Sequence, residues 1–232
     1  MTPRFSVVVP TLNEAQRLPA TLAAARNAFG DAAEYIVSDG GSNDATCEVA
    51  TRFGAHVIQG NRGRGDQLQR GFCATRADIC VFLHADTLLP ADARGALERV
   101  LATPAVVGGA FSLEFTQPDR SAILIRVLQH AINLRARLFK TATGDQAIFA
   151  RRFVLQEIGG VPRVPLFEDV RLCRALKHKG RFVILADRVA TSARLWQALG
   201  TGRGILLHLS LRALHALGAS PRFLARHYPS PR

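Results

Sequence analysis

Short apolar runs and amphipathic segments alternate along the first hundred residues of the chain. The runs have the length of strands buried on both faces, and they are Phe5–Val9, Tyr35–Val37, His56–Ile58 and Ile79–Leu83. The segments between them have the apolar spacing of helices, which we expect after a cap at Asn13, from Asn43 to about Phe53, and from Gln67 to about Thr75. Helices that join successive buried strands predict an α/β fold with a parallel, doubly wound sheet.

The pattern becomes less regular after Pro104. We expect a long strand at Val106–Phe115, in which Gly108 and Gly109 suggest a bulge or a close backbone approach. The later elements that we expect are helix Ser121–Lys140, strand Gln146–Ala150, helix Glu168–Lys179, strand Phe182–Leu185 and helix Ile205–Leu217. No repeat, low-complexity tract or linker interrupts the chain. We therefore expect a single domain over residues 1–232, with a regular half (1–103) and an irregular half (104–232).

The composition is that of a globular protein, with 48% hydrophobic and 21% charged residues, but the net charge is +12 and the pI about 11.0. Such a charge suits an anionic partner: nucleic acid, a lipid surface or a phosphorylated substrate. Arginine supplies most of it, and GC-rich coding explains an arginine bias equally well. Nucleic acid is the least expected partner, because only two tyrosines and one tryptophan are available to interleave with the basic residues.

The four cysteines show no C-x-x-C motif and no zinc spacing, so nothing requires an oxidising compartment. Cys80 lies inside an apolar run and is expected to be a small core residue. The N-terminal stretch MTPRFSVVVPTLNE enters a strand directly, without the apolar region of a signal peptide. No window reaches the roughly 18 uncharged apolar residues of a membrane span. We therefore expect a cytoplasmic protein.

Polar residues follow each predicted strand of the first half. They are Thr11, Asn13 and Glu14, then Asp39, then the glycines 63 and 65 with their neighbouring arginines, then His84 and Asp86. Because the carboxyl ends of parallel strands open on one edge of a sheet, these groups should meet there. Taken singly, Asp39 and Glu14 are explained as turn residues. Taken together, carboxylates converging on one edge need cations, donors or a ligand, because they repel each other.

The type of ligand follows from which motifs are present. A G-x-G-x-x-G loop is missing after the first strand, where PTLN stands, and no Walker A lysine exists, so neither a nicotinamide enzyme nor a P-loop enzyme is expected. The Asp86 carboxylate suits a hard cation, Mg²⁺ or Mn²⁺, which commonly shares a substrate diphosphate. His84 could be a second ligand of Mn²⁺ or a donor to ribose or phosphate. Arg62 and Arg64 either cradle a diphosphate or belong to a solvated loop.

Four stretches, in this order and spacing, carry a resemblance: VVVPTLNEA, SDGGSNDAT, FLHADT and PLFEDVRLCRAL. Together they resemble the inverting glycosyltransferases of the large family 2, and the resemblance covers essentially the whole chain. The nearest likeness is to a short bacterial branch described as selenodomain- or arsenosugar-associated transferases. The resemblance implies the GT-A fold, with a mostly parallel Rossmann-like sheet, a nucleotide-binding half at 1–103 and an acceptor-side half at 104–232.

The resemblance also implies roles for individual residues. A UDP- or GDP-sugar donor would be bound by Thr11, Asn13, Glu14, Asp39, Arg64, His84, Asp86 and Arg194, of which Thr11, Glu14 and Asp39 would hold the base and ribose. Asp86 would meet the diphosphate and a Mg²⁺ or Mn²⁺ ion. Asp169 would be the catalytic base. The acceptor is not identified, and the residues on its side would be Gly144, Asp145, Glu168 and Trp196.

Three of these assignments have a simpler alternative. Glu168 and Asp169 open a predicted helix, where backbone N–H groups favour a carboxylate, so the pair either supplies the base that an inverting transfer needs or merely caps the helix. Trp196 either stacks on an acceptor sugar or is buried against the sheet. Asp145 either orders the acceptor or forms a turn.

The chain also departs from the family pattern. His84 stands where the D-x-D motif has its first aspartate, which puts metal binding by two carboxylates in doubt. Leu195 stands where the branch has an arginine, which leaves Arg194 to reach the diphosphate, and Gln69 replaces an asparagine. A sugar-1-phosphate nucleotidyltransferase is the alternative enzyme, but it usually carries a glycine-rich basic loop where this chain has PTLN.

Two segments combine apolar and basic faces: the predicted helix 121–140, with Arg126, Arg135 and Arg137 on its polar side, and the C-terminal run 202–228. Core packing explains most of their leucines. A peripheral contact with the inner face of a membrane and a homodimer interface both stay open.

Overall fold

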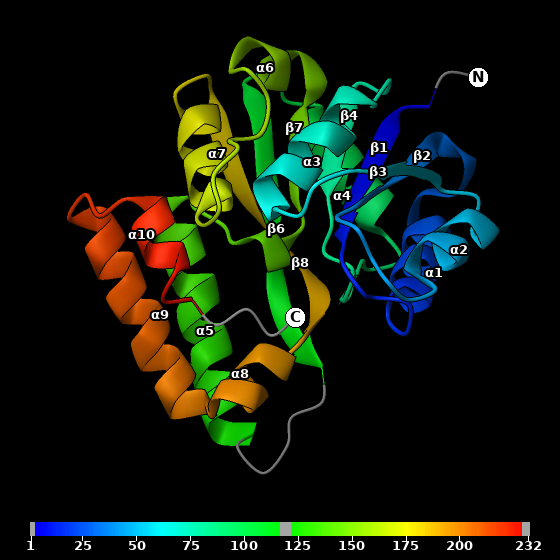
Figure 1. Ribbon diagram of the computed structural model, residues 1–232. Coiled ribbons are helices and arrows are strands. Elements are labelled where there is room, and N and C mark those ends of the chain that lie inside the picture. Colours follow the sequence, from blue (N-terminus) through cyan, green and yellow to red (C-terminus); the bar gives the residue numbers. More distant parts are fainter. Residues whose placement is uncertain (1–2, 117–121, 229–232) are drawn as a thin grey trace.

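The computed structural model describes residues 3–116 and 122–228, and one eight-stranded sheet forms its centre (Figure 1). The strand order is β3-β2-β1-β4-β7-β6-β8-β5. The four strands of the first half are parallel to one another, with β1 between β2 and β4. Their bounds are β1 Phe5–Thr11, β2 Ala33–Asp39, β3 His56–Gln59 and β4 Ile79–Phe82.

The second half completes the same sheet with mixed pairing. β7 (Ile148–Arg151) runs antiparallel between β4 and β6 (Val106–Thr116). The long strand β8 (Arg181–Ser192) is parallel to β6, and the two-residue β5 (Thr87–Leu88) pairs antiparallel with β8. Because β7 lies between β4 and β6, the two halves of the chain share one sheet.

Helices cover both faces of the sheet. Residues of α1 (Leu18–Phe29), α2 (Thr46–Arg52), α4 (Ala93–Leu101), α5 (Ala122–Phe139) and α8 (Arg194–Leu199) join one apolar core, which includes Val7, Val9 and Val81. Residues of α3 (Arg64–Cys73), α6 (Arg152–Glu157) and α7 (Glu168–Lys177) join the other, which includes Val8, Cys80 and Phe82. Neighbouring residues of β1 and β4 therefore point into opposite cores, as strands buried on both faces require.

The last two helices close a third, smaller core. Leu211 of α9 (Thr201–Ala216) and Leu224 of α10 (Pro221–Ala225) pack with Leu166 and Phe167, which come directly before α7. In Figure 1, α9 lies beside α5, and α10 lies close to α7. The C-terminal helices are thus fixed to the loop that leads into α7.

The two glycines of β6 allow a close approach of neighbouring strands. A Cβ atom on Gly108 would lie 2.6 Å from the carbonyl oxygen of Phe149 in β7, and one on Gly109 would lie 2.7 Å from the Phe149 ring. The pairing of β6 with β8 shifts in register between Val106 and Gly108. Both expectations for these glycines, a bulge and a close approach, are met.

Most predicted elements are confirmed, including the parallel, doubly wound first half and the buried position of Cys80. Several details were wrong. The helices α4, α6, α8 and α10 and the two-residue strand β5 were not predicted. Strand β8 extends to Ser192 instead of ending at Leu185, and β7 begins at Ile148 after a short 3-10 turn at Gly144–Gln146. Helix α5 confirms the expected helix from Ala122 onwards, and Ser121 lies outside the described residues.

Replacing Gly108 should destabilise the sheet. In Gly108→Ala the new methyl group would meet backbone atoms of β7, which cannot move aside cheaply, so the free energy of unfolding should fall by about 1–3 kcal/mol. The control is Gly202→Ala in α9, where nothing lies within 4 Å of the added atom. Urea unfolding measures both variants, and equal stability of the two would contradict the close packing of β6 on β7.

Candidate active site

The carboxyl ends of β1 and β2 are held together by a buried aspartate. Asp39 accepts hydrogen bonds from the hydroxyls of Thr11 (3.0 Å) and Ser42 (2.5 Å) and from the backbone N–H groups of Gly41 (2.9 Å) and Ser42 (2.8 Å). Burial on its own would raise the pKa of Asp39, but these hydrogen bonds outweigh it and keep the pKa below its ordinary value. Asp39 is therefore an ionised residue that organises the 39–42 turn.

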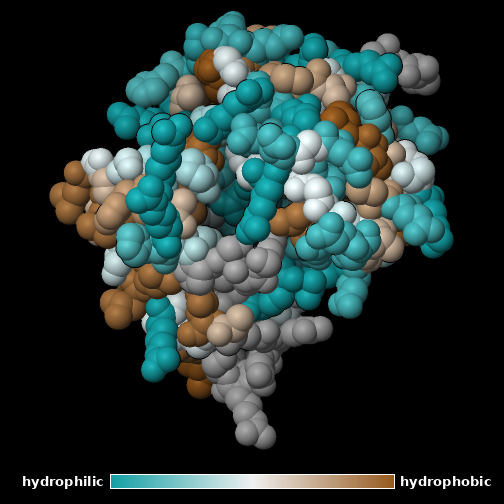
Figure 2. Space-filling model, viewed as in Figure 1, coloured by the Kyte–Doolittle hydropathy of each residue, from teal (hydrophilic) through white to brown (hydrophobic). Residues whose placement is uncertain are grey.

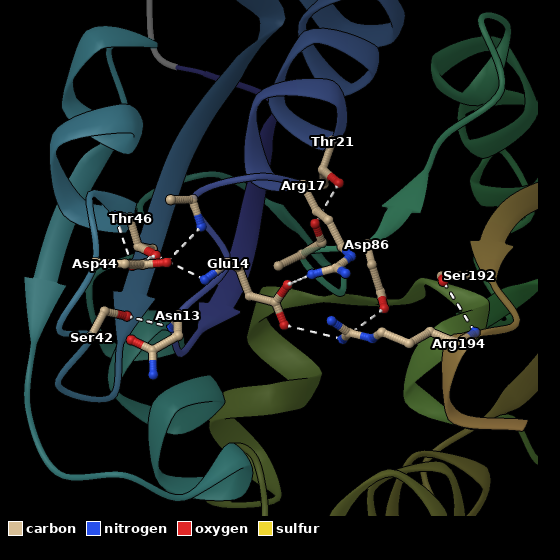
Figure 3. A network of polar contacts seen from close by, with 12 residues as sticks. Asn13, Glu14, Arg17, Thr21, Ser42, Asp44, Thr46, Asp86, Ser192 and Arg194 are labelled. Carbon is tan, nitrogen blue, oxygen red and sulfur yellow. Dashed lines mark hydrogen bonds and ion pairs between the residues drawn. The ribbon is translucent and has the colours of Figure 1, made fainter. Parts of the chain in front are cut away.

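The sequence predicted that Asn13 caps the first helix, and this prediction is wrong. Helix α1 begins only at Leu18, and the residue at its N-cap position is Arg17. The Asn13 side chain instead accepts a hydrogen bond from the backbone N–H of Asn43 (2.8 Å), while its own N–H donates to Ser42 (2.8 Å). Asn13 has the left-handed backbone conformation (φ 55°), which asparagine tolerates better than most residues. It thus connects the loop after β1 to the loop after β2 (Figure 3).

Arg194 joins two carboxylates from different strand ends (Figure 3). Its guanidinium lies 3.4 Å from the buried Glu14 and 3.5 Å from Asp86, and Arg17 lies 3.5 Å from the other oxygen of Glu14. The 3.4–3.5 Å separations make these ion pairs, not short hydrogen bonds. Glu14, Asp86 and Arg194 were all predicted on the donor side, and they meet at one point of the sheet edge although the first and the last are 180 positions apart in the chain.

His84, which stands at the first position of the D-x-D motif, packs against Gly144 on the predicted acceptor side. The His84 ring lies against Gly144, because a Cβ atom on Gly144 would approach Cε1 of that ring to 2.9 Å. The backbone N–H of Gly144 in turn donates to Asp169 (2.9 Å). These contacts connect the end of β4 to the predicted base, Asp169.

Asp169 lies in the first turn of α7 and is 7% exposed. Its Oδ2 atom takes the Gly144 N–H and its Oδ1 atom the N–H of Val170 (2.7 Å). The residue before this turn, Phe167, has the left-handed conformation (φ 63°) and stacks on His215 of α9 with ring centroids 4.5 Å apart. A non-glycine residue in that conformation is strained, and the packing of α9 maintains it.

Glu168 and Arg64, which the sequence placed on the acceptor side and the donor side, contact each other directly as a buried ion pair. Burial would lower the pKa of Arg64, but Glu168 and Asp169 beside it raise the pKa instead. Burial also raises the pKa of Glu168, against the opposing effect of Arg64. The pair joins the start of α3 to the start of α7, so Arg64 is engaged with protein and does not stand open as a diphosphate cradle.

Asp145 sits deeper than a turn residue needs to. Its Oδ1 atom is buried without a hydrogen-bond partner in the described part of the chain. Burial raises the pKa of Asp145, and the charges of Asp169 and Asp86 add to the increase. The three carboxylates are therefore close enough to influence one another, which places Asp145 in the same site.

Trp196 is buried, which was the second of the two alternatives for this residue. It is 8% exposed, belongs to the core that α5 and β6 share, and packs against Phe115 and His208 at ring-centroid distances of 6.5 and 4.7 Å. Stacking on an acceptor sugar needs an open ring face, which this burial does not leave.

The carboxylates fit a divalent ion only in a limited way. Among the described residues no three His, Cys, Asp or Glu side chains are grouped as a complete metal site. Asp86 offers one carboxylate, 18% exposed, and Asp145 offers one buried oxygen without a donor. An ion here would need most of its ligands from a bound diphosphate and water, as Mg²⁺ commonly does.

Several site residues were not singled out from the sequence. Gln67 of α3 donates to the carbonyl oxygens of Thr11 (2.7 Å) and Ser38 (3.1 Å) and so locks α3 to the ends of β1 and β2. Asp44 accepts the N–H of Ala15 (3.2 Å). A Cβ atom on Gly65 would lie 2.6 Å from the carbonyl oxygen of Pro162, so this glycine lets the loop before α7 approach α3. The glycines around residue 63 were the only signal for these contacts.

Figure 2 shows a hollow with hydrophilic walls near the middle of the face that Figure 1 presents, between α3 and α7. The hollow lies where Arg64 and Glu168 begin these two helices. The carboxylates at residues 14, 39, 86, 145 and 169 thus belong to one side of the molecule, along the edge formed by the ends of β1, β2 and β4.

Removing the charge of Asp39 should cost stability in a pH-dependent way. Because its pKa is lowered in the folded protein, its ionised form stabilises the fold at neutral pH, and this contribution is lost as the pH falls through the folded-state pKa. Asp39→Asn should therefore unfold more easily at pH 7 by about 1–3 kcal/mol, with a smaller difference below pH ~4. Denaturant unfolding at both pH values measures this. Asp31→Asn, an exposed aspartate before β2, is the control, and a pH-independent difference for Asp39 would contradict the assignment.

The site geometry can be set beside known proteins. The profile described as Glycosyl transferase family 2 matches residues 6–159. A glycosyltransferase of PGL/p-HBAD biosynthesis from Mycobacterium bovis is 34% identical over 170 residues, 68% of this chain. The chain covers 62% of that relative's length. Glycosyltransferase AglD of Haloferax volcanii is 34% identical over 149 residues, 58% of this chain and 24% of its own.

Solved structures share the fold at low sequence identity. The mannosyltransferase PcManGT from Pyrobaculum calidifontis, in complex with GDP-Man and Mn²⁺, has a TM-score of 0.65 at 19% identity, covering 91% of this chain and 65% of its own. Glucosyl-3-phosphoglycerate synthase from Mycobacterium tuberculosis, in complex with Mn²⁺, UDP and glucosyl-3-phosphoglycerate, has a TM-score of 0.62 at 22% identity, covering 89% and 78%. The expected GT-A fold is confirmed, whereas the selenodomain-associated branch stays a prediction. The chain belongs to glycosyl transferase family 2.

Proposed function

We propose that the protein transfers a sugar from a nucleoside-diphosphate sugar to an acceptor hydroxyl with inversion of configuration. The observation that carries this proposal is the meeting of five distant segments at one sheet edge: Glu14 and Asp86 around Arg194, and Gly144 bonded to Asp169. A sugar nucleotidyltransferase would share the sheet, but the PTLN loop after β1 lacks the glycine-rich basic turn of that class.

The donor would lie over the ends of β1, β2 and β4. PcManGT is solved with GDP-Man and the M. tuberculosis synthase with UDP, which supports a UDP- or GDP-sugar here. In this chain the Asp39 carboxylate already accepts four hydrogen bonds, and a carboxylate has about four acceptor sites. We therefore infer that Asp39 shapes the base and ribose pocket through the 39–42 turn, and that Thr11 and Glu14 complete its walls.

The chemical step requires one base and a stabilised leaving group. Asp169, held by the N–H groups of Gly144 and Val170, would take the proton of the acceptor hydroxyl as its oxygen forms a bond to the sugar's anomeric carbon. The bond from that carbon to the diphosphate oxygen breaks on the opposite side, and the nucleoside diphosphate leaves with the electron pair. Asp145 and Glu168 flank the base on the acceptor side.

Positive charge at the leaving group would come from two sources. Arg194 already sits beside Asp86 and can pair with phosphate oxygens. Asp86 would hold a Mg²⁺ or Mn²⁺ ion, which when bound neutralises charge on the diphosphate. Mn²⁺ in the two neighbouring structures supports a divalent ion, and the single carboxylate of this chain suggests that the donor supplies much of its coordination.

Asp169→Asn tests the proposed base. Thermal-shift screening with UDP-, GDP- and dTDP-sugars first identifies the donor, and turnover is then followed as release of the nucleoside diphosphate. Removing the base should lower turnover by at least ~10²-fold while leaving donor affinity unchanged. Glu48→Gln, an exposed acid in the first turn of α2, is the matched control and should keep full activity. Near-normal turnover of Asp169→Asn would remove this residue from the role, and pyrophosphate release from a sugar phosphate and NTP would favour the nucleotidyltransferase.

We also propose that the protein acts at the inner face of an anionic membrane. Ten large apolar side chains are exposed on α5, on α9 and directly after α9, and the two helices lie side by side: Ile123, Leu124, Val127, Leu134, Leu138, Phe139, Leu206, Leu209, Leu214 and Leu217. No described helix is long and apolar enough to cross a membrane. We call this surface the apolar face, and it forms the brown areas at the left and bottom of Figure 2.

The charges around the apolar face favour lipid over a second copy of the chain. Residues 120–144 and 188–232 contain no aspartate or glutamate, and exposed arginines such as Arg126 and Arg137 flank the leucines. A dimer through this face would bring two basic surfaces together without acids to compensate, whereas anionic headgroups attract each nearby arginine by about 1 kcal/mol. A helix with apolar and basic sides is the usual form of an interfacial contact.

Vesicle binding tests this contact. The protein should sediment with phosphatidylglycerol vesicles and much less with phosphatidylcholine vesicles, and the double variant Leu206→Glu/Leu209→Glu should reduce binding at least tenfold. Phe153→Glu, an exposed apolar residue of α6 outside this face, is the control. Equal binding of the leucine variant would contradict the proposal. A doubled mass in analytical ultracentrifugation that the same variant halves would identify the face as a dimer interface instead.

A further inference from the structure

A second hollow lies on the outer side of α7. It has a volume of about 1040 Å³, and its walls come from α7, from the end of α9 and from the 218–221 turn before α10. Five basic side chains line it: Arg171, Arg174 and His178 of α7, and Arg212 and His215 of α9. No aspartate or glutamate is among its described lining residues. We call it the cationic pocket.

The cationic pocket adjoins the proposed base. Phe167 and Val170, which line it, belong to the same turn of α7 as Glu168 and Asp169. Phe167 stacks on His215, another lining residue, so one wall of the pocket is the packing that holds this turn in place. A group bound in the pocket would therefore lie beside the helix turn that carries Asp169, and Arg212 of the pocket is close enough for the Asp169 charge to act on it.

Arg212, which lines the pocket, and Arg135 of α5, close enough to Arg212 for their charges to interact, have no ion-pair partner in the described part of the chain. Within residues 3–116 and 122–228 neither Arg212 nor Arg135 of α5 forms an ion pair, and the Nε and Nη2 atoms of Arg135 are buried without a hydrogen-bond partner. Arg126 and Arg137 on the same helix are exposed, so Arg135 departs from the polar side on which the sequence placed it. Buried donors without acceptors are rare, because each costs about 1–3 kcal/mol.

The electrostatics of these arginines agree with the missing partner. Burial, and then the nearby charge of Arg212, lower the pKa of Arg135 to about 10 against the opposing effect of Asp145 and Asp169, and burial lowers the pKa of Arg212 against the same two aspartates. Burial and Arg212 also lower the pKa of His208 to about 4, so His208 is neutral and adds no charge. Two buried guanidinium groups thus repel each other beside the site, and an anion between them would remove the repulsion.

We propose that the cationic pocket binds the phosphate group of the acceptor, with Arg212 and Arg135 as its inner ligands and Arg171 and Arg174 at its rim. This inference rests on the proposed transfer reaction and names the acceptor class, a hydroxyl compound that carries phosphate. A dianion matches several converging arginines better than a carboxylate does, and guanidinium forks bind phosphate oxygens in pairs. The volume exceeds that of one phosphate and leaves room for the group that carries it.

The test uses phosphate probes with the donor site filled. Protein saturated with UDP or GDP, whichever the donor screen identifies, is titrated with glycerol 3-phosphate, inorganic phosphate and uncharged glycerol in a calorimeter. Both phosphates should bind and glycerol should not. Arg212→Gln and Arg135→Gln should each weaken phosphate binding at least tenfold. Arg203→Gln, an exposed arginine of α9 outside the pocket, should not.

Further measurements separate the possible outcomes. Donor affinity should be the same in all variants, so a loss of donor binding would point to the donor site and not to the cationic pocket. If Arg212→Gln fails to fold, as judged by circular dichroism, Arg171→Gln at the rim replaces it. Phosphate binding that is equal in the pocket variants and in Arg203→Gln would overturn the proposal.

A vesicle competition experiment identifies the kind of molecule that carries the phosphate. Vesicles with phosphatidic acid that compete with glycerol 3-phosphate, in the wild type but not in Arg212→Gln, would make the acceptor a phospholipid-type compound, and no competition would leave a soluble phosphate ester. Turnover of neutral and phosphorylated acceptors is then compared. A neutral acceptor that is used as well as its phosphorylated form, by wild type and Arg212→Gln alike, would remove the pocket from acceptor recognition even if donor and base behave as proposed.

Discussion

Carboxylates crowded at one edge of a sheet are the constraint on which this structure depends. Glu14, Asp39, Asp145, Glu168 and Asp169 are all largely buried there, and an uncompensated buried charge is costly. Four of them are compensated in two ways: hydroxyl and N–H donors satisfy Asp39 and Asp169, while arginines from distant segments satisfy Glu14 and Glu168. The hydrogen bonds and ion pairs that assemble the site are therefore the same contacts that lower the free-energy cost of burying its charges.

These contacts join the two halves of the chain. Arg64 and Gly65 connect the start of α3 to the segment before α7, and Arg194 connects the end of β8 to the ends of β1 and β4. The apolar cluster of Leu166, Phe167, Leu211 and Leu224 adds the C-terminal helices. The position of Asp169 consequently depends on elements from the whole chain, although its own helix is only ten residues long.

The sequence was sufficient for the parts of the fold that rest on local pattern. Continuous apolar runs identified β1 to β4, and the rule that parallel strands open on one edge brought Glu14, Asp39 and Asp86 towards one site. Asp169 joined them only through the family resemblance. The short helix α6 and the second part of β8 were missed because their stability comes from neighbours: β8 pairs with β6 along its length, and Arg188 alternates with buried Val189. The role of Asn13 was misjudged for the same reason, since its partners lie 30 residues away.

Side-chain pairings were beyond sequence reasoning. Nothing local distinguishes Arg135, with its buried nitrogens, from the exposed Arg126 and Arg137 on the same helix, because only the packing of α9 encloses it. Likewise Arg64 looked like a ligand of a phosphate because its partner Glu168 is 104 positions away. Arginine-rich sequences leave such choices open, since a guanidinium serves a carboxylate and a phosphate equally well.

The bridge from Arg194 to Glu14 and Asp86 has a thermodynamic consequence. A diphosphate that draws the guanidinium towards itself would leave the Asp86 oxygens uncompensated and so increase their affinity for a cation. Anion and metal would then favour each other's arrival, and by linkage the coupling must be equal in both directions. An arginine shared by two acids would thus couple the loading of donor and metal without any rearrangement of the sheet.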